Sequence, residues 1–189
     1  MKELLLQLIR KRVSLTEDQL AEILTYFEPQ SIKKNKHLLE EGAIADRLFF
    51  VNKGCLRLYF RNDELSTATR FMAFEQTFLT SIVSFISRQP ATEFIQAVED
   101  SEVLSISHND FTFLRSHIPG WDKFYIYILE YGLTVINNKL SSLLTQTAKE
   151  RYQDLLKNNP ELTQRLSNAN LAAYLAISPE TLSRLKSNI

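Results

Sequence analysis

The sequence predicts an α+β fold in which an N-terminal β-roll with flanking helices is followed by a long helix and a C-terminal helix-turn-helix. Short segments rich in β-branched and aromatic residues lie between residues 37 and 107, a helical period begins after Pro119 and Gly120, and two short helices joined by a tight turn end the chain. We expect three parts, spanning residues 1–118, 119–145 and 146–189, and the last part lacks a full β-wing.

The composition is typical of a globular protein, with 189 residues, 44% of them hydrophobic and 23% charged. Because 22 basic residues balance 22 acidic ones, broad non-specific coating of nucleic acid is disfavoured. No apolar run reaches the roughly 18 residues that a membrane span needs, so we expect a cytoplasmic protein with no membrane partner. Cys55 is the only cysteine, which excludes an internal disulfide framework and a zinc finger, and we interpret it as a small buried hydrophobe in a strand.

Residues 1 to about 30 have a helical pattern, with Ser14 and Thr16 as candidate caps. The segments "RLFFVN" and "CLRLYFRN" then flank Lys53-Gly54, which we interpret as a hairpin-like turn. Further strands are predicted at "STATRFMAF", "EFIQAV" and "EVLSIS". A short helix, "SIVSFISRQ", interrupts them and is expected to end at Pro90.

The long helix carries an apolar seam with alternating spacings of three and four residues, sustained for about three heptads. The seam consists of Ile126, Leu129, Leu133, Ile136, Leu140 and Leu143. One interpretation is a coiled-coil contact with a second copy, and the other is a helix packed on its own domain. We expect one face to pack on the roll and the seam to form a homodimer.

The last segment, "LSNANLAAYLAISPETLSRLK", has the apolar skeleton of a helix-turn-helix. The helix before this segment is expected to begin at a capping box formed by Thr147 and Glu150 and to end at Asn158-Asn159-Pro160. In its first helix, the expected cap is Ser167 or Asn168, and the buried face is Leu171, Ala172 and Leu175. Ile177 lies in the turn. In the second helix, the cap is Ser178, the first position is Pro179, and Leu182 and Leu185 face back.

The remaining face of the second helix is polar, and its candidate DNA-contacting residues are Ser178, Glu180, Thr181, Ser183, Arg184 and Lys186. An arginine can bind guanine through two hydrogen bonds, and a glutamate can accept from cytosine N4. Alternatively, Glu180 and Arg184 form an exposed pair worth about 0.2–0.5 kcal/mol, and a bare helical hairpin would explain the apolar residues equally well. Ala176 stands where such turns usually have glycine, and a left-handed conformation there costs about 1 kcal/mol.

These segments together resemble the Crp–Fnr family of bacterial transcription regulators over nearly the whole chain. "LLEEGAIADRLFFVNKGCLRLYF" resembles the family's cyclic-nucleotide-binding-like sensor roll, and the seam helix resembles its dimerisation helix. "AKERYQDLL" and "ISPETLSRLK" resemble parts of its DNA-binding domain, and Glu180, Thr181 and Arg184 match its E-T-x-x-R pattern. The resemblance implies a dimeric regulator that binds a palindromic operator in double-stranded DNA, with RNA polymerase as a further partner and a small-molecule effector that the sequence does not identify.

The resemblance also places an effector pocket at Thr80, Ser81, Arg88, Ala91 and Thr92. Relatives that bind cyclic nucleotides have Gly-Glu where this chain has Thr80-Ser81, and Arg-Ser or Arg-Thr where it has Ala91-Thr92. The groups that contact the ribose and the cyclic phosphate are therefore replaced. Arg88 could substitute, or it could be a solvated charge at a helix end. We expect no response to cyclic AMP or cyclic GMP, and a roll that holds a neutral or apolar ligand or none.

Two other classes of protein could contain such a roll. A metal-dependent enzyme on the roll is disfavoured because His37, His108 and His117 lack close His-x-His spacing, and no nucleophile–base arrangement, phosphate loop or dinucleotide fingerprint is visible. We therefore expect no enzymatic activity, no metal and no cofactor. The alternative function is a ligand-sensing or protein-interaction module whose helix-turn-helix no longer binds DNA, which Ala176, the missing wing and the modest local charge favour.

Overall fold

The computed structural model describes residues 2–61 and 67–187 and divides the chain into two compact units. The first unit contains Met1–Leu58 and Met72–Gly132, and the second contains Tyr59–Phe71 and Leu133–Ile189. No helix in the described ranges has the length and apolar character needed to cross a membrane.

Two short helices begin the first unit, α1 (Glu3–Arg12) and α2 (Glu17–Thr25). Thr16, one of the two candidate caps, caps α2 through a capping box in which its hydroxyl accepts from the Gln19 N–H at 3.2 Å. The helical pattern was expected to reach about residue 30, but it ends at Thr25, and strand β1 begins at Glu28. Leu20, Ile23 and Phe27 are buried, so this part of the chain packs on the core through an apolar face.

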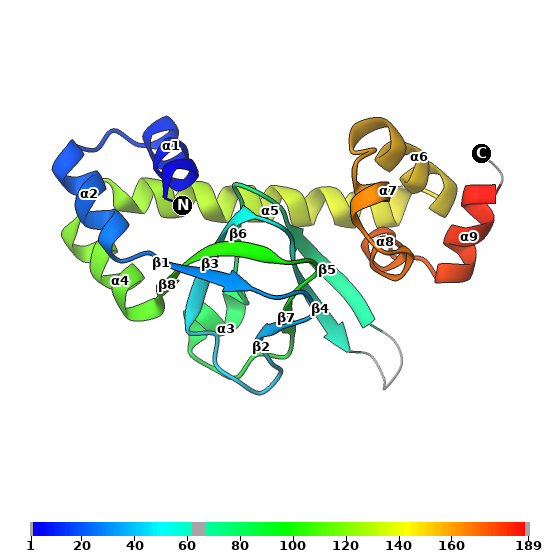
Figure 1. Cartoon of the computed structure of the whole chain (residues 1–189), viewed down its shortest axis with the longest axis horizontal. Helices are drawn as coiled ribbons and strands as arrows, with labels where there is room; N and C mark the ends of the chain where they lie inside the picture. The colour runs from blue at the N-terminus through cyan, green and yellow to red at the C-terminus, as the bar shows by residue number, and fades with distance from the viewer. Residues whose placement is uncertain (1, 62–66, 188–189) are drawn as a thin grey trace. The chain divides into compact units, whose positions relative to one another are not determined.

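Within residues 2–61 and 67–187, eight strands form a β-roll-like body of two four-stranded sheets, with strand orders β1-β8-β3-β6 and β2-β7-β4-β5 (Figure 1). The strands are β1 (Glu28–Ile32), β2 (His37–Leu39), β3 (Arg47–Lys53), β4 (Leu56–Arg61), β5 (Thr67–Ala73), β6 (Phe78–Leu79), β7 (Phe94–Ala97) and β8 (Ser101–Ser107). The predicted strand segments are therefore confirmed, apart from Asn62 and Ser66, which lie outside the described residues.

The predicted hairpin at Lys53-Gly54 is wrong, because β3 and β4 belong to different sheets. Gly54 has a φ of +102°, and its N–H donates to the Glu75 carboxylate at 2.8 Å. A Cβ at Gly54 would lie 2.3 Å from the Ser101 hydroxyl oxygen, so only glycine fits this close approach of two chain segments. The turn carries the chain from one sheet to the other.

Helices close the first unit around a core of fully buried side chains that includes Phe50, Leu104 and Ile106. They are α3 (Ile82–Ser87), α4 (His108–His117) and the beginning of α5 (Trp121–Thr145), where Trp121 and Phe124 are fully buried. The predicted short helix exists, but it ends at Arg88 in a left-handed conformation (φ 59°) rather than at Pro90. Cys55 is fully buried, as expected, but it lies directly before β4 rather than inside a strand.

The described residues of the second unit include the rest of α5 and the shorter helices α6 (Ala148–Asn158), α7 (Leu162–Arg165), α8 (Asn168–Leu175) and α9 (Pro179–Ser187). The capping box at Thr147 is confirmed, since its hydroxyl accepts from the Glu150 N–H at 3.3 Å and its own N–H donates to the Glu150 carboxylate at 2.7 Å. The small core of this unit includes Tyr152, Leu155, Leu162, Leu166, Leu171, Leu175 and Leu182.

Candidate functional site

Helix α8 ends in a tight turn that the sequence singled out at Ala176. Ser167 caps the start of α8 by accepting from the Asn170 N–H at 3.3 Å. At its end, Ala176 is left-handed with φ 53° and ψ 50°. The Ala176 N–H donates to Ala173 O at 3.3 Å and the Ile177 N–H donates to Ala172 O at 3.0 Å, which is the hydrogen-bond pattern of a Schellman motif. The turn is therefore well formed even though alanine replaces the usual glycine.

Helix α9 begins directly after this turn. Ser178 caps it by accepting from the Thr181 N–H at 3.1 Å, and Pro179 occupies its first position, as predicted. Leu182 is buried on the side of α9 that faces α8, where Leu171, Ala172 and Leu175 are also buried, and Leu185 is half-buried. The apolar skeleton predicted for the two helices is thus present.

The opposite face of α9 carries the candidate DNA-contacting side chains. Ser178, Glu180, Ser183, Arg184 and Lys186 are exposed, and Thr181 is half-buried beside the cap. The structure therefore brings all six residues together on one helix and its cap.

The Glu180–Arg184 ion pair of the alternative interpretation is not formed. Among the described residues, the Arg184 guanidinium has neither a hydrogen bond nor an ion pair, whereas the Lys186 ammonium donates to the Asn168 side chain at 2.6 Å. Hydrogen bonds from its own backbone N–H and from the Ser178 hydroxyl lower the pKa of Glu180, and Arg184 adds a smaller electrostatic contribution. The guanidinium is consequently available to an external acceptor.

Arg151 fixes the end of α8, and sequence reasoning counted this residue only as one of the basic charges. Its Nε donates to Leu175 O at 3.0 Å and its Nη1 donates to Gln146 O at 2.7 Å. Two carbonyls from separate segments are thus held by one planar guanidinium on α6. Its position in the capped helix "AKERYQDLL" could have suggested a structural role, but its partners are distant in sequence.

The apolar seam of α5 is largely uncovered. The exposed fractions are 50% for Ile126, 62% for Leu133, 37% for Ile136, 51% for Leu140 and 41% for Leu143, and Leu129 is half-buried. Trp121 and Phe124, which lie at the start of the same helix, are fully buried. The helix therefore has apolar positions that the described part of the chain leaves exposed to solvent.

The predicted effector residues lie together between β6 and β7, but their polar groups bond to the protein itself. The Thr80 hydroxyl donates to Arg47 O at 2.8 Å, and the Ser81 hydroxyl donates to the Glu93 carboxylate at 2.6 Å. Thr80, Ser81 and Glu93 are all buried, the last with 2% exposure. Sequence reasoning missed Glu93, although its position directly after Thr92 was visible.

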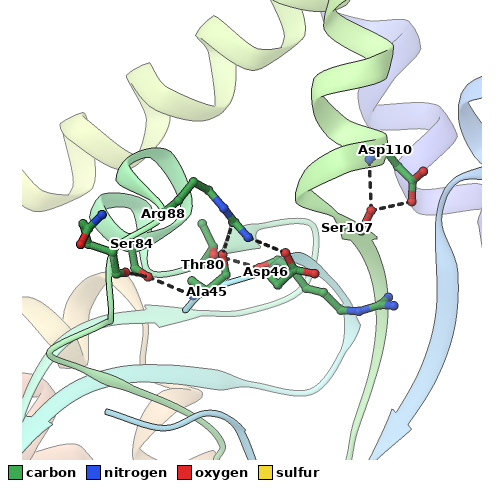
Figure 2. A network of polar contacts seen from close by, with 9 residues as sticks. Ala45, Asp46, Thr80, Ser84, Arg88, Ser107 and Asp110 are labelled. Atoms are coloured by element: carbon green, nitrogen blue, oxygen red, sulfur yellow. Dashed lines mark hydrogen bonds and ion pairs between the residues drawn. The ribbon is translucent and has the colours of Figure 1, made fainter. Parts of the chain in front are cut away.

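Arg88 makes specific contacts rather than acting as a solvated charge at a helix end. Its guanidinium forms an ion pair with Asp46 at 2.6 Å and donates to Ala45 O at 2.9 Å, and its side chain is 35% exposed (Figure 2). The left-handed conformation at Arg88 turns the chain at the end of α3. Asp46 was not recognised from the sequence, because 42 residues separate it from Arg88.

The last two predicted effector positions differ in environment. Ala91 is buried, its N–H donates to Ala43 O at 2.8 Å, and its carbonyl accepts from the Gly42 N–H at 2.8 Å. Thr92 is exposed. In the described part of the chain, no group of three or more His, Cys, Asp or Glu side chains is placed to hold a metal ion.

Comparisons with known proteins agree with this architecture. Residues 29–117 match the family model described as "Cyclic nucleotide-binding domain". No curated protein matches the chain by sequence.

Solved structures of regulators are similar over most of the chain. The c-di-GMP responsive global regulator CLP of Xanthomonas campestris is 18% identical, with a TM-score of 0.73 and coverage of 92% of this chain and 91% of CLP. FixK2 of Bradyrhizobium japonicum is 17% identical, with a TM-score of 0.72 and coverage of 86% and 83%. The catabolite activator protein of Thermus thermophilus is 23% identical, with a TM-score of 0.57 and coverage of 93% and 84%. The chain shares the fold of these regulators.

Proposed function

We propose that this chain is a homodimeric, sequence-specific DNA-binding transcription regulator whose β-roll does not take a cyclic nucleotide. The observation that carries the proposal is the outward face of α9, where Arg184 is exposed and has no intramolecular partner among the described residues. An exposed arginine without an intramolecular partner, on a helix that enters the major groove, can donate two hydrogen bonds to a guanine.

Each polar residue of α9 has a role that its position supports. Arg184 reads a guanine, and Glu180, which lies one turn earlier, accepts from a cytosine amino group. Ser178, Thr181 and Lys186 contact phosphates and set the register of the helix on the duplex, and Ser183 completes the face. The charge of residues 146–189, six basic and four acidic, is modest, so affinity depends on these local contacts more than on a general field.

The exposed seam of α5 supports dimerisation. Burying one large apolar side chain is worth about 1.5–3 kcal/mol, and six such side chains from each partner can exceed the roughly 4–15 kcal/mol cost of association. A parallel two-fold contact along Ile126–Leu143 would place two copies of α9 roughly 34 Å apart, one turn of DNA, which fits a palindromic operator. In this scheme residues 1–118 sense, residues 119–145 dimerise, residues 146–189 bind DNA, and RNA polymerase is a further partner.

The hydrogen bonds and the ion pair that the predicted effector residues already make support the proposal that the roll does not respond to cyclic nucleotides. A buried cyclic phosphate needs a cation and donors, because burial of an unpaired charge is costly. The Arg88 guanidinium is paired with Asp46, and the Ser81 hydroxyl is occupied by the buried Glu93. Neither cyclic AMP nor cyclic GMP would find a free cation at this place.

A gel-shift with the DNA upstream of the protein's own gene tests the proposal. We expect a retarded band that survives a large excess of unrelated DNA and weakens for Arg184→Ala. Absence of specific retardation for the well-folded dimer would instead favour a ligand-sensing or protein-interaction module that does not bind DNA.

A further inference from the structure

Helix α6 carries an arginine close to its N-terminal end, where a cation is unfavourable. Thr147 caps the helix, and Arg151 lies four residues after this cap. The helix dipole is positive at the N-terminal end, so it favours acidic side chains there and disfavours basic ones. The contacts that favour an arginine at this position therefore lie outside α6.

These contacts are backbone carbonyls at the ends of two other helices. The Nε of Arg151 donates to the carbonyl of Leu175, the last residue of α8, and its Nη1 donates to the carbonyl of Gln146, the residue that follows α5. Carbonyls at the C-terminal end of a helix lack intrahelical partners, and the dipole there favours a cation. One guanidinium thus offers donors and a positive charge to the ends of both helices.

The shape of the guanidinium makes this contact geometrically specific. Its N–H groups lie in one plane in a fixed arrangement, so the two carbonyls of Leu175 and Gln146 are held at a fixed distance from each other. The ammonium of a lysine has no such fork and cannot hold both carbonyls in the same geometry. Arg151 is half-buried, which shields its hydrogen bonds from competing water.

The junction between α5 and α6 has further bonds that do not involve Arg151. The Ser142 hydroxyl on α5 donates to the side-chain oxygen of Gln146, whose Nε2 donates to the Asp154 carboxylate on α6 at 2.6 Å. The Gln146 N–H also donates to Ser142 O at 3.0 Å. The junction keeps these bonds when Arg151 is replaced, so a replacement acts mainly on the end of α8.

The end of α8 determines where α9 begins. Leu175 is followed directly by the left-handed Ala176, and Ser178, three residues after Leu175, caps α9. Because the connection is this short, a carbonyl held at Leu175 also holds the start of α9. Arg151 therefore links the end of the seam helix α5 to the helix with the candidate DNA-contacting residues.

We propose that Arg151 is a positioning residue that sets the distance between the two α9 helices of the dimer, and hence the half-site spacing that the regulator accepts. This inference rests on the proposed function. In that dimer the seam of α5 joins the two copies, so a fixed link from α5 to α9 gives each α9 a fixed place relative to the two-fold axis. A dimer with fixed recognition helices binds half-sites at one spacing. Without the link, the side chains of α9 keep their chemistry but the spacing is no longer selected.

Gel-shifts with operators of different spacing test the proposal. The probes are the palindrome that the unmodified protein selects from a random DNA pool and two derivatives with one base pair added or removed at its centre. The unmodified protein should bind the derivatives at least about tenfold more weakly, because one base pair turns a half-site by roughly 35° and moves it by roughly 3.4 Å. Arg151→Lys should bind all three probes within about threefold and keep its preference for guanine, since Arg184 is unchanged.

Two further variants separate positioning from a general loss of stability. Arg151→Met keeps the length of the side chain without its donors, and it should relax the spacing as Arg151→Lys does. Leu162→Ala creates a cavity in the core of the same unit and should keep the spacing preference at a temperature at which every variant is folded. The proposal is overturned if the unmodified protein accepts all three spacings, if both arginine variants keep its preference, or if Leu162→Ala loses that preference too.

Amide hydrogen exchange without DNA separates this inference from the proposed function. The Ala176 and Ile177 amides close the turn between α8 and α9, and in Arg151→Lys they should exchange about tenfold faster because the turn opens more often. If the unmodified protein retards no DNA but these amides exchange faster in the variant, the DNA-binding proposal fails and the hold of Arg151 on the turn stands. If DNA is bound specifically but neither the exchange nor the spacing preference changes, the role of Arg151 is wrong.

Discussion

The Arg88 guanidinium lies 2.6 Å from the Asp46 carboxylate and also donates to the backbone carbonyl of Ala45. The chain reaches this geometry because α3 ends at a left-handed Arg88, which directs the side chain toward the loop before β3. The Arg88 guanidinium is therefore committed to contacts within the protein.

Cyclic AMP and cyclic GMP should bind more weakly than about 10 µM, which corresponds to about −7 kcal/mol, in a calorimetric titration. The variant Asp46→Asn tests the role of Arg88, because asparagine keeps the size of Asp46 but lacks the charge that pairs with the Arg88 guanidinium. We expect weak or no binding for this variant as well, because Ala91 and Thr92 still lack an arginine. Tight binding to either protein would show that Thr80-Ser81 and Ala91-Thr92 are wrongly matched to the nucleotide-contacting residues of the relatives.

The left-handed Ala176 makes the turn between α8 and α9 a site where glycine should be better. Ala176→Gly should stabilise the protein by up to about 1 kcal/mol, since an L-residue with a Cβ is strained at φ 53°. Ala173→Gly, the same change inside α8, should destabilise by about 1 kcal/mol. Thermal unfolding of both variants measures the two effects. A loss of stability in Ala176→Gly would contradict the claim that the left-handed conformation strains Ala176.

Much of the fold follows from local sequence signals. The caps at Thr16, Thr147 and Ser178 act over three residues, and the strand segments carry their own β-branched and aromatic pattern, so both could be predicted. The prediction of a hairpin at Lys53-Gly54 was wrong because strand pairing depends on contacts between residues far apart in the sequence, here those of Gly54 with Glu75 and Ser101.

In the candidate sites, too, local patterns could be predicted from the sequence, whereas contacts between distant residues could not. The polar face of α9 belongs to a single short helix. It could therefore be predicted from the spacing of polar and apolar residues in the sequence. Asp46 and Glu93, by contrast, gain their roles from contacts with Arg88 and Ser81 that only the folded chain creates. The contact of Arg151 with the end of α8 spans 24 residues, so no local pattern marks it.

The apolar seam of α5 makes the assembly testable. Leu133→Glu should yield monomers in light scattering and lose operator binding, because a charge would be buried against the partner helix. Asn138→Glu adds the same charge to an exposed position outside the seam and should remain dimeric. A dimeric Leu133→Glu would mean that the seam does not hold the two copies together.

Burial lowers the pKa of Lys139 on α5 to about 8, which predicts a dependence of stability on pH. The unfolded chain holds this proton up to about pH 10.5, whereas the folded chain releases it near pH 8. Stability from this group therefore rises as the pH increases from about 8 to 10.5, by at most about 3 kcal/mol. Lys139→Met lacks this contribution, so its stability relative to the unmodified protein should fall over that range in urea unfolding. A constant difference would show that Lys139 titrates normally.

Selection from a random pool of double-stranded DNA, carried out in parallel with the unmodified protein and with Arg184→Ala, tests the central claim most directly. The unmodified protein should enrich a palindrome whose half-sites are centred one helical turn apart, with a guanine fixed at one position of each. Arg184→Ala should lose that preference, at a cost of about 1–3 kcal/mol, while Lys186→Ala should weaken binding to all sequences alike. Enrichment of no common site, or an identical site for Arg184→Ala, would contradict the assignment of α9 as a DNA-reading helix.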